Sequence, residues 1–263
     1  MRNVIIHYHI FKNAGSSVDR LLQDSFGTRW ATFEGSTPTS LLAVHDVEDF
    51  LDRHPHVSAV SSHLARPPLP GNVDAFPIIF LRNPIDRAAS VYAHEHRASS
   101  NVESSEVAKV RDFAGYVKWC LDAALGRDDG GVVIRNYQVV HLSGASFRYG
   151  HIYNANALQS DLTDVLSFLD RLPFFGIVEE FELSLQLLKR TAGRVWSDLQ
   201  IANIKENVTP GRKDSLKSRL EEVRHELGSD LLHCLEEENR LDSQLHEAAT
   251  AMFQSRLSRH GLI

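Results

Sequence analysis

A segment near the N-terminus, His9–Ser17, has residue types that can hold an anion (His-Ile-Phe-Lys-Asn-Ala-Gly-Ser-Ser). Its small residues would let backbone N–H groups approach a phosphate at the start of a helix, and Lys12 would add a positive charge. Taken alone, the segment is explained equally well as an ordinary strand-to-helix turn with serine caps. Its lysine precedes its glycine, so the GxxxxGK[ST] order of an ATP- or GTP-binding loop is absent. This disfavours magnesium-dependent hydrolysis of those nucleotides.

A second pair of side chains can contact another phosphate. Arg82 ends an apolar segment, and Ser90 follows on a predicted helix, eight residues later. This spacing is slightly more than two helical turns, so both side chains can border one pocket. An arginine fork and a serine hydroxyl suit a phosphate dianion. The alternative is that Arg82 pairs with Asp86 and that Ser90 only fills its helix.

The elements that must position these residues predict a parallel α/β sheet. Apolar segments rich in β-branched residues predict strands at 4–10, 57–61, 76–81 and 174–178. Helical spacing predicts helices at 16–26, 47–53, 84–97, 113–125, 132–142, 155–172, 181–192, 214–227, 229–238 and 241–257. Strands that alternate with helices favour an α/β fold with a central parallel sheet flanked by helices. We expect a helical C-terminal third and one domain over residues 1–263.

Local signals sharpen some of these predictions. Asn83 and Pro84 suit the cap and the first position of the helix that follows them. The polar segments 98–106 and 143–152 predict loops, and we expect the serine-rich first one to be mobile and able to act as a lid. Ligands of open α/β sheets bind at the carboxyl ends of the strands, where both phosphate-binding segments lie.

Composition excludes several classes of protein. Hydrophobic residues make up 43% and charged residues 24% of the 263 residues, as in soluble globular proteins. The net charge of −6 disfavours nucleic acid as a partner. No segment has the ~20 apolar residues that span a bilayer, and no signal peptide is visible. We expect a cytoplasmic protein with buried thiols at Cys120 and Cys234 and, without HExxH or CxxC spacing, no metal.

The two phosphate-binding segments together resemble motifs of a known enzyme family. His9–Ser17 resembles the 5′-phosphosulfate loop of sulfotransferases, which use 3′-phosphoadenosine 5′-phosphosulfate (PAPS), and Phe80–Tyr92 resembles their 3′-phosphate motif. The branch most similar is that of heparan sulfate 2-O-sulfotransferases and related carbohydrate sulfotransferases. The resemblance continues in order through 136–138, 142–144, 175–181 with Ser184, and 238–242. It departs at Phe11, where the family often has proline, and at 13–16, where it often has Thr-Gly-Gly-Thr.

The resemblance implies a P-loop-like sheet, PAPS as donor, 3′-phosphoadenosine 5′-phosphate (PAP) as product and no metal. Lys12 would contact the bridging oxygen and stabilise the charge on the departing phosphate. The implied nucleotide-binding residues are Lys12, Asn13, Ala14, Gly15, Ser16 and Ser17 for the 5′ side, Arg82 and Ser90 for the 3′-phosphate, and Thr209, Arg212 and Lys213 in a closing loop. An exposed basic turn is the alternative for that closing loop. Ala14 is expected in an ordinary backbone conformation.

The acceptor hydroxyl needs a base, and histidine titrates near neutrality. We predict His63, because it follows a strand and because Ser62-His63 resembles the segment of the branch that carries the catalytic histidine. A surface-loop histidine is the alternative. His94 and Glu95 are rival bases that can instead contact the substrate, whereas His7 and His9 are expected to be strand residues.

The residues leave the acceptor open. In this branch it would be a hydroxyl-bearing partner, a glycan, and the lack of a visible membrane anchor predicts a bacterial-type member. A tyrosylprotein or small-metabolite sulfotransferase keeps the same donor. A catalytically silent nucleotide-binding protein and a P-loop kinase are the alternatives from other classes. The sequence sets no oligomeric state.

Overall fold

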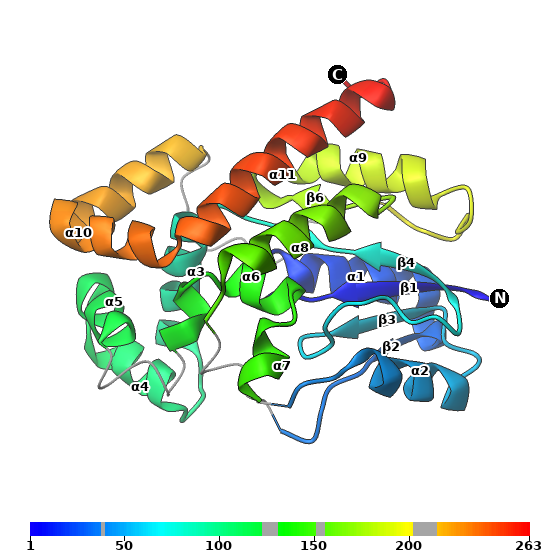
Figure 1. Ribbon diagram of the computed structural model, residues 1–263, viewed down its shortest axis with the longest axis horizontal. Helices are drawn as coiled ribbons and strands as arrows, with labels where there is room; N and C mark the ends of the chain where they lie inside the picture. The colour runs from blue at the N-terminus through cyan, green and yellow to red at the C-terminus, as the bar shows by residue number, and fades with distance from the viewer. Residues whose placement is uncertain (38–39, 123–130, 151–155, 202–214) are drawn as a thin grey trace.

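Four parallel strands form the central sheet, in the order β2-β3-β1-β4. They are β1 (Asn3–Tyr8), β2 (Trp30–Thr32), β3 (Ala59–Ser62) and β4 (Asp74–Ile78). The computed structural model describes residues 1–37, 40–122, 131–150, 156–201 and 215–263. The apolar strand β1 is buried between its neighbours, with Ile5 paired to Ala59 of β3 and to Phe76 of β4. All of these strands point the same way, so their carboxyl ends lie along one edge of the sheet, towards α3 and α6 in Figure 1.

The predicted strand 76–81 is wrong in one respect, since it is two strands. The chain pairs with β1 as far as Ile78 and then changes partner. The Ile79 carbonyl accepts the Gly176 N–H at 2.8 Å, and β5 (Phe80–Leu81) then pairs in parallel with β6 (Gly176–Ile177). This change carries the chain away from the sheet just before Arg82.

Helices surround the sheet and form the C-terminal third, as predicted (Figure 1). They are α1 (Gly15–Phe26), α2 (Val44–Arg53), α3 (Pro84–Arg97), α4 (Glu103–Val110), α5 (Phe113–Leu121), α6 (Tyr137–Leu142), α7 (Ala145–Tyr149), α8 (Gln159–Arg171), α9 (Phe181–Ala192), α10 (Leu216–Glu238) and α11 (Arg240–Arg259). The 3₁₀ turns are η1 (Gly27–Arg29), η2 (Gly131–Ile134) and η4 (Val178–Glu180). Gly228, with φ of 71°, interrupts α10 between the two helices expected there.

The start of α3 confirms its local signals. The Asn83 side chain accepts the N–H groups of Ile85 and Asp86, both at 3.1 Å. Two predicted loops are wrong, because α4 begins inside 98–106 and α7 lies inside 143–152. The buried face of α4 is made of Ser104, Ser105 and Ala108. Small residues pack there, so the apolar spacing that reveals a helix in a sequence is missing.

The helix predicted at 132–142 is also divided. Asn136 has a φ of 43°, which ends η2 and starts α6 separately. The short edge strand β2 was not predicted.

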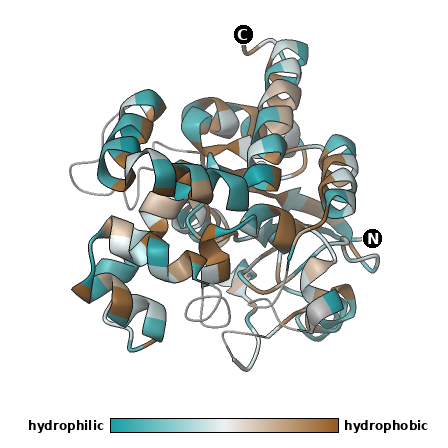
Figure 2. Ribbon diagram, turned by 60° about the vertical axis from the view of Figure 1, so that its left-hand side comes forward, coloured by the Kyte–Doolittle hydropathy of each residue, from teal (hydrophilic) through white to brown (hydrophobic). Residues whose placement is uncertain are grey.

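Two groups of buried apolar side chains stabilise the fold. One lies around the central sheet and the other between α3, α5 and α10, and Phe11 of the anion-binding loop packs against both. Figure 2 shows the outer helices with hydrophilic residues on one side and hydrophobic residues on the other. Cys120 is buried as expected, but Cys234 is exposed, so the expectation for that thiol is wrong. Among the described residues, no helix is both long and apolar enough to cross a membrane.

Candidate functional site

The loop His9–Ser17 leaves the carboxyl end of β1 and enters α1 through a strained turn. Lys12 and Ala14 have φ angles of 64° and 61°, whereas Asn13 between them has no positive φ. Backbone that alternates in this way forms a concavity of N–H groups that can bind an anion. The expected ordinary conformation of Ala14 is wrong, because the turn into α1 takes a left-handed residue directly before Gly15. Each such residue costs about 1–2 kcal/mol, so surrounding contacts must hold the loop.

The first turn of α1 has N–H donors that the helix does not use. The amides of Ser17 and Val18 donate to the Ala14 carbonyl at 3.0 and 3.2 Å, and those of Gly15 and Ser16 have no backbone acceptor in the described part of the chain. No side chain of the described residues caps this end, and its first turn has no acidic residue. A carboxylate there would compete with a ligand, so this helix N-terminus is suited to an external anion.

The Asn13 side chain holds the loop from inside. Its amide nitrogen donates to the Phe80 carbonyl at 2.8 Å and to Gln138 Oε1 at 2.7 Å. The same Gln138 oxygen accepts the Arg82 N–H at 2.9 Å. Asn13 is only 2% exposed, so its side chain serves the protein, and a ligand would meet its backbone.

This connection extends to the C-terminal helix. Asp242 accepts the N–H groups of Gln138 and Val139 at 3.0 and 2.9 Å. In return, Asn136 Oδ1 accepts the N–H groups of Leu241 and Asp242 at 2.9 and 3.0 Å. The segments 136–138 and 238–242, both included in the resemblance, thus form one polar bridge, which we define as Asn13, Asn136, Gln138, Asn239 and Asp242.

Three imidazoles gather beside the loop. His7 lies in β1 and His9 directly after it, and their Nδ1 atoms lie 2.8 and 2.9 Å from the two oxygens of Asp19 on α1. The His9 ring stacks on the His63 ring with 3.8 Å between centroids. Its other edge faces Gly15, where a Cβ atom would lie 2.0 Å from Nε2. His7 is a strand residue, as expected, whereas His9 lies just beyond the end of β1 and joins the loop to the predicted base.

His63 follows β3, and its side chain is 46% exposed. Its Nδ1 lies 2.9 Å from Glu34 Oε1, and its backbone N–H donates to the same oxygen at 3.0 Å. An Nδ1–H held by a carboxylate leaves Nε2 with a lone pair, which is the form that a general base needs. Sequence reasoning missed Glu34, because the short strand β2 that places it was not recognised.

The pKa values of His9 and Asp19 fit their hydrogen-bonded arrangement. Burial lowers the pKa of His9 to about 4, although its hydrogen bond to Asp19 opposes the shift, so His9 is neutral at pH 7. Burial alone would raise the pKa of Asp19, but the hydrogen bonds with His7 and His9 outweigh it and lower that pKa. The ligand atoms of these three residues lie within 4.8 Å of one another, close enough for a metal ion. Imidazole N–H groups that donate to the Asp19 carboxylate satisfy the same atoms without a metal ion.

A buried cation lies behind His63. Arg66 is 0% exposed, and its Nη1 donates to the His63 carbonyl at 2.9 Å. Burial lowers its pKa to about 10, which leaves it charged at pH 7. The buried His141 lies 3.4 Å from Arg66, and burial followed by this arginine lowers its pKa well below the usual range. This positive charge makes the surroundings of the imidazoles unfavourable for a cation.

Lys12 lies on the other side of the loop. Its Nζ is 5.9 Å from the centroid of the Phe11 ring, and that ring meets His94 of α3 edge-on at 5.3 Å. Burial and then Lys12 lower the pKa of His94. Glu95 instead accepts the Ser105 hydroxyl of α4. Of the two rival bases, the structure therefore brings His94 to the loop and turns Glu95 towards α4.

Arg82 forms the ion pair that was considered as the alternative. Its Nε lies 2.9 Å from Asp86 Oδ2, and its Nη1 donates to the Lys12 carbonyl at 2.8 Å. Arg219 of α10 reaches Asp86 Oδ1 at 2.8 Å. Sequence reasoning missed Arg219, since nothing local connects it with residues more than a hundred positions earlier. Ser90 is half-buried on α3.

The predicted closing loop cannot be placed, because Thr209, Arg212 and Lys213 lie outside the described residues.

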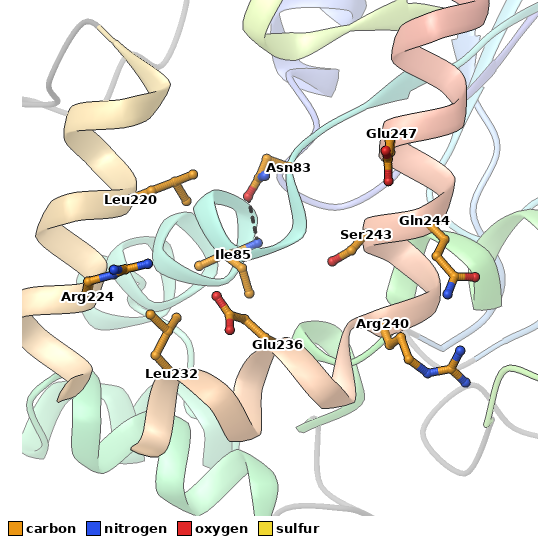
Figure 3. A pocket seen from close by; sticks show the side chains of 10 residues that line it. All are labelled: Asn83, Ile85, Leu220, Arg224, Leu232, Glu236, Arg240, Ser243, Gln244 and Glu247. Atoms are coloured by element: carbon orange, nitrogen blue, oxygen red, sulfur yellow. Dashed lines mark hydrogen bonds between the residues drawn. The ribbon is translucent and has the colours of Figure 1, made fainter. Parts of the chain in front are cut away.

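A cavity of about 410 Å³ lies between the start of α3, α10 and α11. Figure 3 shows Leu220 and Leu232 of α10 and Ile85 of α3 around this space, with Arg224 and Glu236 pointing towards Ile85. The lining mixes apolar groups with charges of both signs, and it includes none of the predicted site residues that the structure describes.

Comparisons with known proteins identify a relative but no activity. No protein-family model matches the chain. A protein of Archaeoglobus fulgidus, described only as uncharacterized, is 31% identical over 261 residues, which cover 96% of this chain and 98% of that protein. The aligned region therefore covers nearly the whole length of both chains. The chain therefore belongs to the same family as the archaeal protein.

Proposed function

We propose that this protein is a sulfotransferase with a P-loop-like sheet that moves a sulfuryl group from PAPS to a hydroxyl of a carbohydrate acceptor. The observation that carries the proposal is the meeting of an uncapped helix N-terminus, Lys12 and the Glu34–His63 pair at one edge of the sheet. The first two suit an anionic donor, and the third suits removal of a proton from a hydroxyl.

Each residue has a defined task in this reaction. The amides of Gly15 and Ser16 and the Lys12 ammonium hold the 5′ phosphosulfate group. His63 Nε2 accepts the proton of the acceptor hydroxyl while the hydroxyl oxygen bonds to sulfur. The bond from sulfur to the bridging phosphate oxygen breaks, and Lys12 stabilises the negative charge that collects there. Glu34 stabilises the imidazolium that results.

The 3′-phosphate binds on the opposite side of the loop. Arg82 and Arg219 bring two guanidinium groups together around Asp86, next to the Lys12 carbonyl. Guanidinium groups bind phosphate monoesters in preference to neutral ribose. The donor would then lie across the loop, with its reacting end towards His63.

Calorimetry with PAP and ADP tests the donor. We expect PAP to bind at least ten times more tightly, because only PAP has a 3′-phosphate. Equal affinities for PAP and ADP would contradict the assignment of Arg82 and Ser90 to binding of the 3′-phosphate. A screen of glycan, phenol and peptide acceptors with labelled PAPS tests the reaction, and transfer to phenol or tyrosine alone would replace the carbohydrate acceptor.

Variants test the roles. His63→Ala should lower turnover by about 10²–10⁴-fold and leave PAP binding unchanged, because general-base catalysis contributes on that scale. Lys12→Ala should lower turnover more than donor affinity. His45→Ala, at an exposed histidine of α2, is the control and should behave as the parent protein does. Full turnover by His63→Ala would move the base elsewhere.

A further inference from the structure

We propose that Asp19 and His9 form a positioning pair that sets the orientation of His63. The pair fixes the imidazole on which His63 stacks and connects it with the anion-binding loop. This inference rests on the proposed function, since it takes His63 as the base. It assigns a role to two residues that the proposed reaction does not use.

The first step is the hold of Asp19 on His9. Each oxygen of the Asp19 carboxylate contacts one imidazole, with 2.8 Å to His7 and 2.9 Å to His9. Both contacts are made by Nδ1, so a single ionised carboxylate selects the Nδ1–H form of both rings. His7 has a further contact, 3.1 Å from Ser61 Oγ. The carboxylate thereby fixes both the tilt and the proton of the His9 ring.

The second step is the position of His9 between two neighbours. One edge of its ring lies against Gly15, and one face stacks on His63. His9 is 7% exposed, so it has little room to move. His63, which is much more exposed, has two restraints: the Glu34 hydrogen bond in the plane of its ring and the stack on its face. Without the stack, the ring can swing about the Glu34 contact.

The third step concerns charge. The groups that face His63 are Glu34 and His9, with the Arg66 guanidinium at its backbone carbonyl and Asp19, His7 and His141 beyond. A proton taken up by His63 is more stable when the stacked ring is neutral. Burial keeps His9 neutral even though Asp19 favours the charged ring, and Asp19 holds the His9 proton on Nδ1. The pair therefore supports the base by its geometry, and the buried ring beside His63 adds no positive charge.

A metal ion at the same side chains is the competing explanation. Nδ1 cannot donate to Asp19 and bind a metal at once, so the two arrangements exclude each other. Titration with Zn²⁺ separates them. We expect the parent protein not to bind Zn²⁺ stoichiometrically at these side chains. Stoichiometric Zn²⁺ binding that is lost in His9→Asn would overturn the positioning pair.

The experiment compares His9→Asn with His7→Asn. An asparagine amide can still donate to Asp19 from the place of Nδ1–H. His7→Asn removes a ring that stacks on His9, whereas only His9→Asn removes the ring that stacks on His63. We expect His9→Asn to lower kcat by about 10–100-fold, as losses of orienting groups do, with donor KM and PAP affinity within two-fold of the parent protein. His7→Asn should lower kcat several-fold less. Equal losses in the two variants would mean a structural role only, and would overturn the proposal.

Asp19→Asn and its control Asp24→Asn extend the comparison. Asp24 lies on the same helix in an exposed pair with Arg20. Asp19→Asn should lower kcat as His9→Asn does and shift the pH profile of kcat, with partial rescue by Asp19→Glu. Asp24→Asn should change neither. Parent-like turnover and pH profile in Asp19→Asn would overturn the pair.

Nitrogen-15 spectra of the imidazoles give a readout that does not depend on turnover. We expect His9 to be protonated at Nδ1 and bare at Nε2 in the parent protein, and the opposite form would overturn the pair. We also expect the His63 signals to move in Asp19→Asn and to stay in Asp24→Asn. If the parent protein binds no PAP and transfers no sulfuryl group, the proposed function fails. The spectra still decide whether Asp19 and His9 position His63.

Discussion

The two sides of the anion-binding loop carry charge in different ways. On one side, which we call the imidazole side (His7, His9, Asp19, Glu34 and His63), carboxylates hold imidazole rings. On the other, the arginine side (Arg82, Asp86 and Arg219), two guanidinium groups share one carboxylate. Arginine keeps its charge at every physiological pH, whereas histidine changes charge near neutrality. The difference suits one side to proton transfer and the other to a permanent hold on an anion.

The largest effect should come from breaking the arginine side. Asp86→Ala leaves Arg82, which is 4% exposed, without this carboxylate. Loss of one partner of a buried ion pair costs about 3–5 kcal/mol of unfolding free energy. Urea unfolding measures this loss of unfolding free energy. The control Asp24→Ala, at an exposed ion pair, should lose less than about 1 kcal/mol. Equal losses would show that the arginine side is not structurally important.

Acid should destabilise the protein in part through His9 on the imidazole side. The pKa of His9 is about 4 in the folded protein, against 6.5 for an unperturbed histidine. The unfolded chain therefore takes up a proton at a higher pH than the folded one. Stability from this difference is full above pH 6.5 and is lost as the pH falls towards 4, by about 3 kcal/mol.

Urea unfolding at a series of pH values checks this expectation, and His141 should act in the same direction because burial lowers its pKa too. In His9→Gln the loss of stability between pH 6.5 and 4 should be smaller than in the parent protein. An unchanged slope would mean that His9 does not contribute.

Gly15→Ala tests the contact between the loop and the imidazole side. The added methyl group would lie 2.0 Å from His9 Nε2, so it must displace the ring, at a cost of about 1–3 kcal/mol. Thermal unfolding and the His63 signals would report the displacement. Gly144→Ala, where a Cβ meets nothing within 4 Å, is the control and should change both very little.

The smallest effect should come from relieving the loop itself. Ala14→Gly removes the left-handed strain at φ of 61° and should stabilise the fold by up to about 1 kcal/mol. Ala93→Gly, inside α3, should destabilise by about 1 kcal/mol. Thermal unfolding compares the two variants. If both changes destabilise the protein, the stabilisation from relieving strain at Ala14 is smaller than the destabilisation from the extra entropy that a glycine gives the unfolded chain.

Local signals explain which parts of the fold the sequence could predict. Helix α3 has its predicted bounds because Asn83 and Pro84 act within one turn. Strand β1 and the loop after it follow from an apolar segment and its end. The division of 76–81 depends on Gly176, about a hundred residues away, and α4 packs through serines. Such long-range contacts leave no periodic pattern in the chain.

The candidate site divides in the same way. Lys12, Gly15 and His63 were predictable because they follow strand ends, where parallel sheets collect ligand-binding residues. Glu34, Asp19 and Arg219 were not. Each acts by contacting one of the predicted residues or its neighbours, and a single sequence shows residue types without showing which of them meet.

The polar bridge has a consequence for the order in which the protein is made. Asn13 of the loop depends on Gln138, and Gln138 depends on Asp242 of α11. A ribosome adds about 5–20 residues per second, so the loop leaves it on the order of ten seconds or more before Asp242 does. During synthesis, the strained turn at Lys12 and Ala14 lacks the contacts that hold it. The first segment of the site to be made is therefore the last to reach its final shape.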